Sequence, residues 1–467
     1  MKSIFSKDIS LYKRCYYIGL IAYVVLLFLA ILFYKERTIF TDIAFHLFSI
    51  IKYNSLAIQN FRFGAVFTQL FPLLALKAGF SLKGIMIAYS AGFILFYFAC
   101  YVLCGAVFKN YKTALLLLLF NLLFASHTFY WMQSELPQGI SIMLVILAYL
   151  GNKPFEQISP ISLAIIFIAL FMVSFTHPLI IFPFVFSLLF FFFNNHVSIE
   201  KKMLIAIFVF YFIVLVIKNV FFKTAYENQA MGGAGNLISK FPHYFNLYSN
   251  RRLLANFVGK YYWIPLLSSI IVIVYVYKHE YFKALFFLLF MIGYILLIDV
   301  SYPDKNTTDF YIENLYLPMG IFIAIPFVYD ILPLLENKKI AVATIILIIV
   351  SGCIRIYFTH NMYTARLNWE RNYLKQNIGK KLLVDAQKTP VDTLFMTWGT
   401  PYEFWLLSTI ENYNTASIVI NDNPGQLIWA LDNSKSFLTT WGTYSYSEFP
   451  GKYFIFNDTV SNYHMMK

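Results

Sequence analysis

The sequence contains few charged residues for its length. Asp, Glu, Lys and Arg make up 13% of the 467 residues, whereas 60% are hydrophobic. An ordinary soluble domain has about 25% charged residues. With a mean hydropathy of +0.65, a soluble fold could not bury the apolar surface of this chain. The composition therefore indicates that most side chains face lipid.

Cysteine is also scarce, and the basic residues form no continuous patch. Cys15, Cys100, Cys104 and Cys353 lie inside or at the edge of apolar segments, so no disulfide framework is indicated. The formal charge of +13 is compatible with nucleic-acid binding, but Lys and Arg are scattered among short hydrophilic turns. We expect no nucleic acid among the partners, because membrane topology explains the basic excess better.

Long apolar runs recur through most of the chain. Each is long enough to cross, or nearly cross, a hydrocarbon core of about 30 Å as a helix. We predict an all-α polytopic membrane domain over residues 1–357, with about eleven transmembrane helices. The predicted spans are residues 15–34, 85–108, 113–128, 137–150, 160–176, 178–193, 203–220, 262–277, 282–299, 316–335 and 339–357. The first run lacks a small-residue cleavage site, so we interpret it as an uncleaved span.

Basic residues in the short loops indicate the orientation. Lys13, Arg14, Lys109 and Lys112 are typical of those that fall on one side of the predicted spans. That side is then cytoplasmic, and it includes the N-terminus. The long hydrophilic segments fall on the other side, with residues 61–83 as an interfacial hairpin. We expect an integral protein of the bacterial inner (plasma) membrane, in contact with membrane lipids.

The composition changes after the last predicted span. In residues 358–467 the strand-like runs KLLVDA, DTLFMTW, ASIVIND, SFLTTW and KYFIFND alternate with the helix-like runs PYEFWLLSTI and PGQLIWALD. This alternation predicts a small extracytoplasmic α/β domain. Its strand ends are too poor in glycine to predict a nucleotide-binding fold.

The first external segment contains an acidic residue and a histidine four residues apart. In KERTIFTDIAFHLFSIIKY, Asp42 and His46 share one face of a predicted helix. The apolar residues around them predict an amphipathic helix that lies on the membrane surface. Asp42 and His46 are therefore catalytic candidates. A polar helix face that is only exposed to water explains the pattern equally well.

This arrangement resembles the GT-C superfamily of integral membrane glycosyltransferases. The resemblance rests on Asp42 directly after the first span, on the D-x-x-x-H pattern, and on a soluble domain after the last span. It implies that Asp42 is the base that activates an acceptor hydroxyl. It also implies a lipid-linked sugar donor on a polyprenyl phosphate or pyrophosphate, and a glycan, glycolipid or protein acceptor. A single carboxylate suffices, since the lipid phosphate leaves without an acid.

The second external loop offers two further candidates. In SHTFYWMQSELPQG, His127 and Glu135 accompany three aromatic residues. Glu135 is a catalytic candidate that could orient the acceptor, and His127 is a candidate for substrate binding. The alternative for Glu135 is a carboxylate that stabilises the dipole of the following helix, just before Pro137.

Cationic side chains on the external side are candidates for binding the donor phosphate. Arg62 can form a bidentate contact with it, or it can reach toward lipid headgroups. Lys240, Arg251 and Arg252 belong to a later glycine-containing loop, where they could also be interfacial anchors. His177, at the end of the fifth predicted span, is a further candidate, although a lone histidine there is more often structural.

A divalent cation is a possibility that the sequence leaves open. Asp304 and Asp309, in an acidic external loop, could join Asp42 and Glu135 around Mg²⁺ or Mn²⁺, since carboxylate oxygens suit hard cations. The alternative is a solvated loop. The acidic spacing does not match an EF-hand, and no His/Cys cluster has zinc spacing.

Two tryptophans of the C-terminal segment are candidates for contacts with sugar. Trp398 lies in MTWGT and Trp441 in TTWGT. An indole ring can stack on a sugar ring, or it can pack in the domain core, which is its commoner role.

Two other functions compete with glycosyl transfer. A transporter or flippase for lipid-linked glycans would place ionisable residues midway through the spans and often shows repeated halves, neither of which is visible. A polymerase of the O-antigen type usually has two large Arg-rich external loops, and here only residues 221–261 qualify.

Overall fold

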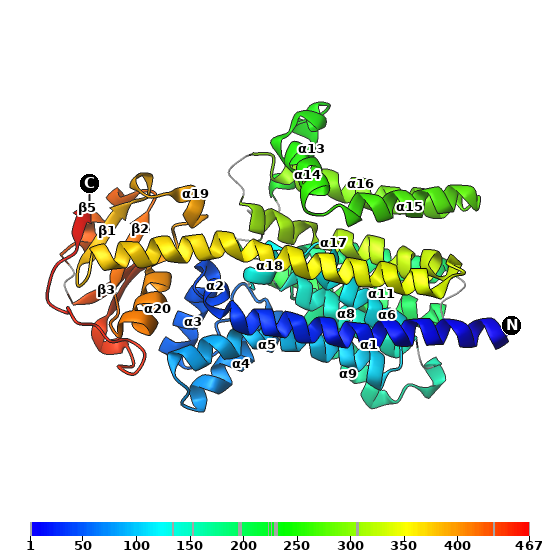
Figure 1. Cartoon of the computed structure of the whole chain (residues 1–467), viewed down its shortest axis with the longest axis horizontal. Coiled ribbons are helices and arrows are strands. Elements are labelled where there is room, and N and C mark those ends of the chain that lie inside the picture. Colours follow the sequence, from blue (N-terminus) through cyan, green and yellow to red (C-terminus); the bar gives the residue numbers. More distant parts are fainter. Residues whose placement is uncertain are drawn as a thin grey trace.

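A computed structural model of the chain describes residues 2–132, 135–151, 154–194, 199–222, 224–225, 227, 232–304, 308–432 and 435–466. Helices dominate, and a small region of β-structure follows the last long helix. Figure 1 shows the helices running lengthwise side by side, with the β-structure gathered at one end.

The helices up to residue 376 are mostly apolar. Their bounds are α1 (Lys2–Leu32), α2 (Tyr34–Thr38), α3 (Thr41–Tyr53), α4 (Val66–Lys77), α5 (Leu82–Val102), α6 (Tyr111–Leu123), α7 (His127–Tyr130), α8 (Leu136–Leu150), α9 (Pro160–Ser174), α10 (Ile181–Phe193), α11 (Lys201–Phe221), α13 (Asn236–Ser239), α14 (Tyr248–Gly259), α15 (Trp263–Tyr277), α16 (Tyr281–Ser301), α17 (Asp309–Pro326) and α18 (Lys338–Gln376). Each predicted span overlaps one of these helices.

Fewer helices than predicted are long enough to cross a membrane. Within the described ranges, length and composition identify six: α1, α5, α11, α16, α17 and α18. The pair α14 and α15, bent by 89°, makes up to seven if it forms one broken span. The apolar helices α6, α8, α9 and α10 are shorter, at 10–17 residues. At a rise of about 1.5 Å per residue these helices are shorter than the thickness of a hydrocarbon core of about 30 Å. The apolar pattern of the sequence did not reveal their length.

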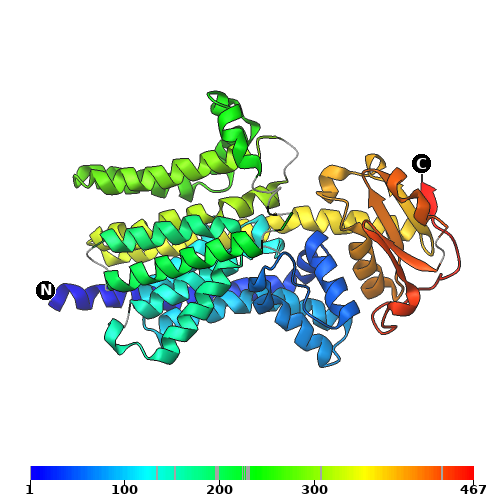
Figure 2. The same ribbon diagram turned by 180° about the vertical axis from the view of Figure 1, so that it is seen from behind.

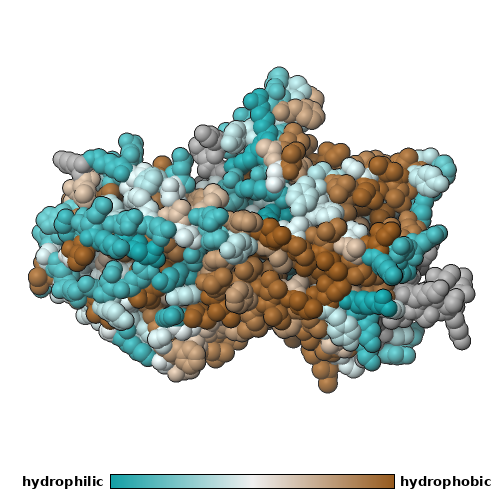
Figure 3. Space-filling model, in the orientation of Figure 1, coloured by the Kyte–Doolittle hydropathy of each residue, from teal (hydrophilic) through white to brown (hydrophobic). Residues whose placement is uncertain are grey.

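The surface of the helical region is apolar, as expected of an integral membrane protein. Figure 3 shows hydrophobic residues over the middle of the bundle, with hydrophilic residues toward both ends of the molecule. α17 lies at the centre of the bundle, since 94% of its most apolar stretch is buried, against 28% for α11. The helices at the periphery therefore present their apolar side chains outward, where lipid would cover them.

α18 connects the membrane bundle to the C-terminal region without a break. It continues past the predicted domain boundary at residues 357 and 358 and ends only at Gln376. The N-terminus and the C-terminal region lie at opposite ends of the molecule (Figures 1 and 2). This separation is what a chain with its termini on opposite sides of a membrane requires.

The C-terminal region combines strands and helices, as predicted. A three-stranded parallel sheet has the order β2-β1-β5, and β3 and β4 form an antiparallel pair. The elements are β1 (Lys381–Asp385), α19 (Val391–Leu394), α20 (Thr400–Asn412), β2 (Ser417–Asn421), β3 (Ser436–Thr439), β4 (Gly442–Ser445) and β5 (His464–Met466). The runs DTLFMTW and KYFIFND are not strands: the first forms α19 and a turn, and the second is irregular.

α3 lies between the membrane bundle and the C-terminal region. It packs against α4 on one side and α20 on the other. Phe48 is fully buried, and its ring lies 4.9 Å from that of Tyr402 and 5.6 Å from that of Trp405. The prediction of a helix is confirmed, but the prediction that its apolar face lies on lipid is wrong, because protein covers its apolar residues.

The predicted interfacial hairpin after α3 is also helical. Pro72 lies inside α4 without ending it. α4 packs along α5, and Phe71 fills the space beside Gly92 so closely that a Cβ there would collide with its ring. Residues 61–83 therefore contain one helix, α4, that packs along the predicted span α5, rather than forming an interfacial hairpin.

Candidate functional site

A cavity of about 670 Å³ opens where the membrane bundle, α3 and the C-terminal region meet. Segments far apart in the sequence contribute its wall. The lining residues are Asp42, Phe45, Gln59, Asn60, Arg62, Trp131, Glu135, His177, Phe310, Tyr311, Asn314, Met396, Trp398 and Trp441. A cavity of this volume, with aromatic walls and a few converging polar groups, is typical of a small-molecule site.

Asp42 occupies the first turn of α3 and faces this cavity. The indole Nε1–H of Trp131 donates to its Oδ2 at 3.0 Å, and the hydroxyl of Thr41 donates to the same oxygen at 3.3 Å. Thr41 has a φ of 27°, which is unusual for a β-branched residue and occurs where the surroundings hold the backbone. Burial raises the pKa of Asp42 above its ordinary value, although both hydrogen bonds oppose the shift. Asp42 is thus a strengthened base in a fixed orientation.

Arg62 and Glu135 form an ion pair in the cavity wall. Arg62 Nη1 lies 3.3 Å from Glu135 Oε2, and both side chains are largely buried. Glu135 directly precedes α8, but its side chain makes no capping hydrogen bond there. The alternative that this carboxylate stabilises the dipole of α8 therefore does not account for its contact with Arg62. Burial raises the pKa of Glu135 to about 7, and Arg62 opposes the shift. The charge of this pair can therefore change near neutral pH.

His177 lines the same cavity at the break between α9 and α10. Its Nδ1 accepts a hydrogen bond from the backbone N–H of Leu179 at 3.2 Å. Burial lowers its pKa well below the usual value, and the positive charges of Arg62 and Lys218 add to this. His177 is therefore neutral at physiological pH and can offer a ring N–H without carrying charge.

His46 lies on α3 but does not line the cavity. It is only 1% exposed, and Gln69 Nε2 lies 3.3 Å from its Nδ1. Burial lowers the pKa of His46 to about 4. The neutral, buried ring of His46 faces α4 and supports the packing of α3. His46 is therefore not placed as a catalytic partner of Asp42 in the cavity, as the sequence suggested.

His127 also lies outside the cavity, in a buried network at the start of α7. Its Nδ1 lies 3.3 Å from the hydroxyl of Tyr363, and its Nε2 lies 3.3 Å from Lys260 Nζ. Glu313 of α17 accepts hydrogen bonds from the backbone N–H groups of Ser126, His127 and Thr128, together with the hydroxyls of Ser126, Thr128 and Tyr261. Glu313 therefore caps α7 from within α17.

The remaining cationic and acidic candidates are not brought to the cavity. Lys240 and Arg251 are exposed on the segment that holds α13 and α14, which projects from the side of the bundle (Figure 1). Arg252 pairs with Asp309 at 3.5 Å. Asp304 is exposed. None of these five residues is among those that line the cavity.

The acidic residues do not form a metal-binding cluster in the part of the chain that the structure describes. No three His, Cys, Asp or Glu side chains converge there as metal ligands would. Of the four acidic candidates, Asp42 and Glu135 line the cavity, and Glu135 is engaged by Arg62. The structure therefore does not bring the four predicted acidic ligands together at one point.

Several residues of the cavity wall were not predicted. Asn314, only 2% exposed, has an amide oxygen with no hydrogen-bond partner among the described residues. Buried polar atoms are normally paired, so this oxygen is available to a bound molecule. Trp131 was visible only as one of three aromatic residues beside Glu135. Neither residue stood out, because Asn314 lies in a hydrophobic helix and Trp131 has no charge.

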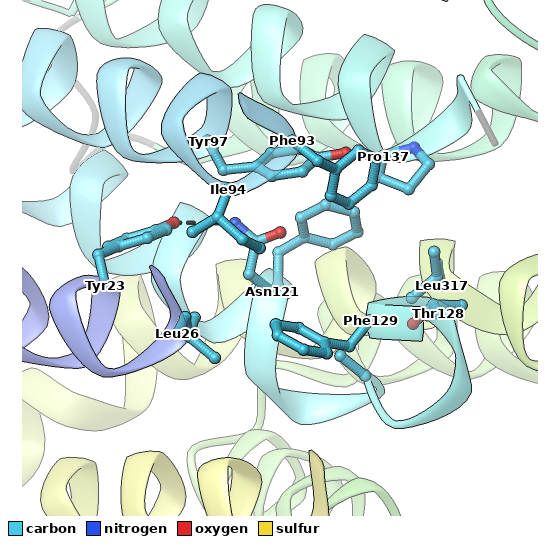
Figure 4. Close-up of a pocket in the computed structure, with 12 residues that line it drawn as sticks. Tyr23, Leu26, Phe93, Ile94, Tyr97, Asn121, Thr128, Phe129, Pro137 and Leu317 are labelled. Carbon is cyan, nitrogen blue, oxygen red and sulfur yellow. Dashed lines mark hydrogen bonds between the residues drawn. The ribbon is translucent and has the colours of Figure 1, made fainter. Parts of the chain in front are cut away.

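A second, smaller cavity lies within the bundle. It has a volume of about 40 Å³ and a largely apolar lining that includes Leu26, Phe93 and Phe129 (Figure 4). Asn121 Nδ2 donates to the hydroxyl of Tyr23 at 2.8 Å and thereby ties α6 to α1. The space accommodates a few water molecules at most, so we regard it as a packing defect.

The geometry of the larger cavity thus brings a carboxylate, a paired arginine, a neutral histidine and several aromatic rings into one space. Comparisons with models of protein families, with curated proteins and with solved structures find no match to this chain. The function has to be inferred from the chemistry of this cavity.

Proposed function

We propose that this chain is a membrane glycosyltransferase that transfers a sugar from a polyprenyl-phosphate-linked donor to an acceptor on the extracytoplasmic face. The observation that carries the proposal is the meeting of Asp42, Arg62, Glu135 and His177 in one cavity, at the end of an apolar bundle. A base beside cationic and N–H groups suits the attack of a hydroxyl on a sugar phosphate.

Asp42 acts as the general base. Its carboxylate takes the proton of the acceptor hydroxyl while the hydroxyl oxygen forms a bond to the anomeric carbon of the donor sugar. The raised pKa of Asp42 favours this role, because a base is most effective when its pKa approaches the working pH. The hydrogen bond from Trp131 holds the carboxylate in one orientation, which reduces the entropy lost on reaching the transition state.

Arg62 and His177 receive the leaving group. As the bond between the anomeric carbon and the phosphate oxygen breaks, its electron pair remains on the lipid phosphate. The guanidinium of Arg62 can bind that phosphate through two parallel N–H groups, and the neutral ring of His177 can donate one more hydrogen bond. Glu135 holds Arg62 in place through their ion pair. The oxygen of Asn314 can accept a hydrogen bond from a sugar hydroxyl.

The location of the cavity supports a donor that is anchored in lipid. Asp42 and Arg62 belong to segments that directly follow α1, and Glu135 and His177 lie at the ends of apolar helices. These positions lie where a polyprenyl phosphate would place its headgroup while its chain stays in the hydrocarbon region. The orientation deduced from the basic loops puts this end of the bundle outside the cytoplasm.

The decisive experiment measures release of the lipid phosphate by the purified protein. Wild-type protein is incubated with a panel of polyprenyl-phosphate sugars and with glycolipids of the host. Asp42→Asn keeps the shape of the side chain and loses its basicity, so the rate should fall by about 10²- to 10⁴-fold while donor binding persists. The matched control is Asp392→Asn, at an exposed residue of α19. Wild-type rates from Asp42→Asn, or no release from any donor, would overturn the proposal.

A further inference from the structure

The C-terminal region contributes a pair of tryptophans to the cavity. Trp398 and Trp441 both belong to a Thr-Trp-Gly-Thr tetrapeptide, and both line the cavity. Their ring centroids are 4.8 Å apart with an angle of 31° between the planes. The hydroxyl of Thr440 donates to the backbone oxygen of Trp398 at 2.8 Å. The two tetrapeptides therefore hold the two indoles side by side.

The backbone of each tetrapeptide requires a glycine after the tryptophan. A Cβ at Gly399 would collide with the backbone of Thr41, so this glycine lets the loop approach the start of α3. Gly442 has a φ of 153°, a conformation that other residues rarely adopt, at the turn between β3 and β4. The backbone conformation after each tryptophan therefore fixes the position of its indole.

Packing does not account for both indoles. Trp441 is 61% exposed, and of the three large aromatic residues that are this exposed in the described part of the C-terminal region, Tyr413, Trp429 and Trp441, it is the one that lines the cavity. A large aromatic side chain left open beside a cavity usually marks a binding surface. Phe45, one helical turn after Asp42, extends the same wall, with its ring 5.3 Å from that of Trp441. The aromatic wall therefore begins next to the catalytic carboxylate.

We propose that Trp398 and Trp441 form the acceptor platform and that the acceptor is a carbohydrate, whose pyranose ring stacks on the indoles. This inference rests on the proposed function. The flat apolar face of a pyranose ring matches an indole surface in size, and its hydroxyls remain free to face Asp42. The sequence alone left lipid, glycan and protein acceptors open, and the platform selects a glycan or the glycan part of a glycolipid.

The sugar of the donor could also stack on the two indoles, but the arrangement of the cavity favours stacking of the acceptor. The groups suited to the donor phosphate, Arg62 and His177, come from the membrane bundle. The tryptophans come from the C-terminal region, at the end of the molecule away from the N-terminus (Figure 2). A soluble or surface-borne acceptor approaches from that direction, whereas a lipid-linked donor approaches from the bundle.

The test measures binding of free glycans and of donor separately. Purified full-length protein is applied to an array of defined microbial oligosaccharides, and hits are titrated by calorimetry. In parallel, binding of polyprenyl-phosphate sugars is measured in the same detergent. Trp441→Ala should weaken binding of the hit glycan by about tenfold, the loss expected for a stacked aromatic contact of about 1.4 kcal/mol, and Trp441→Tyr should restore most of it. Donor binding should not change.

The matched control is Trp429→Ala, because Trp429 is also 60% exposed on the C-terminal region and does not line the cavity. Absence of any glycan hit, equal effects of Trp441→Ala and Trp429→Ala, or weakened binding of the donor alone would overturn the acceptor platform. Tryptophan-dependent glycan binding without any sugar transfer would uphold the platform and overturn the transferase proposal.

Discussion

The carboxylate of Glu403 accepts a hydrogen bond from the backbone N–H of Thr41, the residue before Asp42. Glu403 is fully buried in α20 of the C-terminal region, and its other oxygen pairs with Arg366 of α18. Arg366 also donates to the backbone oxygen of Ile39 at 3.2 Å. The C-terminal region thus holds both backbone ends of the turn that presents Asp42, through one buried ion pair.

Loss of the Glu403 charge should misplace Asp42. In Glu403→Gln we expect a fall in turnover number with little change in donor affinity, because Thr41 and Asp42 shift while the phosphate-binding groups stay. We also expect stability to fall by about 1–3 kcal/mol, since a buried hydrogen bond to a charge is weakened. Denaturation in detergent and steady-state kinetics measure the two effects.

The control for this prediction is Glu411→Gln on the same helix. Glu411 pairs with Lys35 and Arg371, and its side chain keeps 18% exposure. Its contact with Arg371 is bidentate, so Glu411→Gln also weakens a charge-assisted ion pair, but one that does not involve Thr41 or Arg366. Equal losses of turnover in the two variants would show that α20 acts only through general stability.

Arg62 should matter for donor binding, and Arg251 should not. Arg62 lines the cavity, whereas Arg251 is exposed on α14. Removing Arg62 alone would leave Glu135 buried without its cation, so the informative variant is the double substitution Arg62→Ala and Glu135→Gln. It should weaken binding of a polyprenyl-phosphate sugar by about tenfold or more, as expected for a charge-assisted hydrogen bond. Arg251→Ala should bind the donor as wild type does. Loss of donor binding in Arg251→Ala, with wild-type binding in the double variant, would show that the phosphate binds to the segment of α13 and α14 instead.

Donor affinity should depend on pH through Glu135. The pKa of Glu135 is raised to about 7, so at pH 8 its negative charge largely neutralises Arg62, and at pH 6 it is mostly protonated. The sugar phosphodiester stays ionised throughout. Binding should therefore tighten as the pH falls from 8 to 6, and Glu135→Gln should remove this dependence. A pH profile that is unchanged in Glu135→Gln would contradict the prediction.

The two ends of the molecule should lie on opposite sides of the membrane. The N-terminus and the C-terminal region lie at opposite ends of the bundle, and the basic loops predict a cytoplasmic N-terminus. Alkaline phosphatase fused after Lys467 should be active, and a fluorescent protein that needs the cytoplasm should be dark there. The same reporters at the N-terminus should give the opposite result. Cytoplasmic activity at the C-terminus would place the cavity on the wrong side for a lipid-linked donor.

Local patterns predicted much of the secondary structure. Hydropathy located the long apolar helices but not α4, α13 or α14, and the alternation after residue 358 located β1, β2, β3 and α20. Eleven spans were predicted, whereas six helices of the described residues, or seven with the bent pair, are long and apolar enough to cross a membrane. The two numbers differ because hydropathy does not distinguish a short apolar helix packed within a bundle from one that crosses the membrane. The surface-lying α3 was predicted from its apolar residues, but these residues are equally suited to contact with protein.

The candidate site was predicted in part. Asp42, Arg62, Glu135 and His177 were selected one by one, as polar residues at the external ends of apolar segments, and the structure brings all four to one cavity. His46, His127, Lys240, Arg251 and Arg252 satisfied the same criterion and lie elsewhere. Residue type and position along the chain could not separate the two groups, because the direction of a side chain depends on what packs around its helix.

The sequence by itself determined that this chain is a membrane protein, where its long apolar helices form, and that an acidic residue starts the helix after the first span. These properties follow from hydropathy and from hydrogen bonds between near neighbours in the chain. Only the tertiary structure decided that Asp42 and Trp441 share a cavity and that Glu403 holds the turn before Asp42. Such contacts join residues about 360 to 400 positions apart, and they arise from the packing of the C-terminal region against α3, which no local pattern encodes.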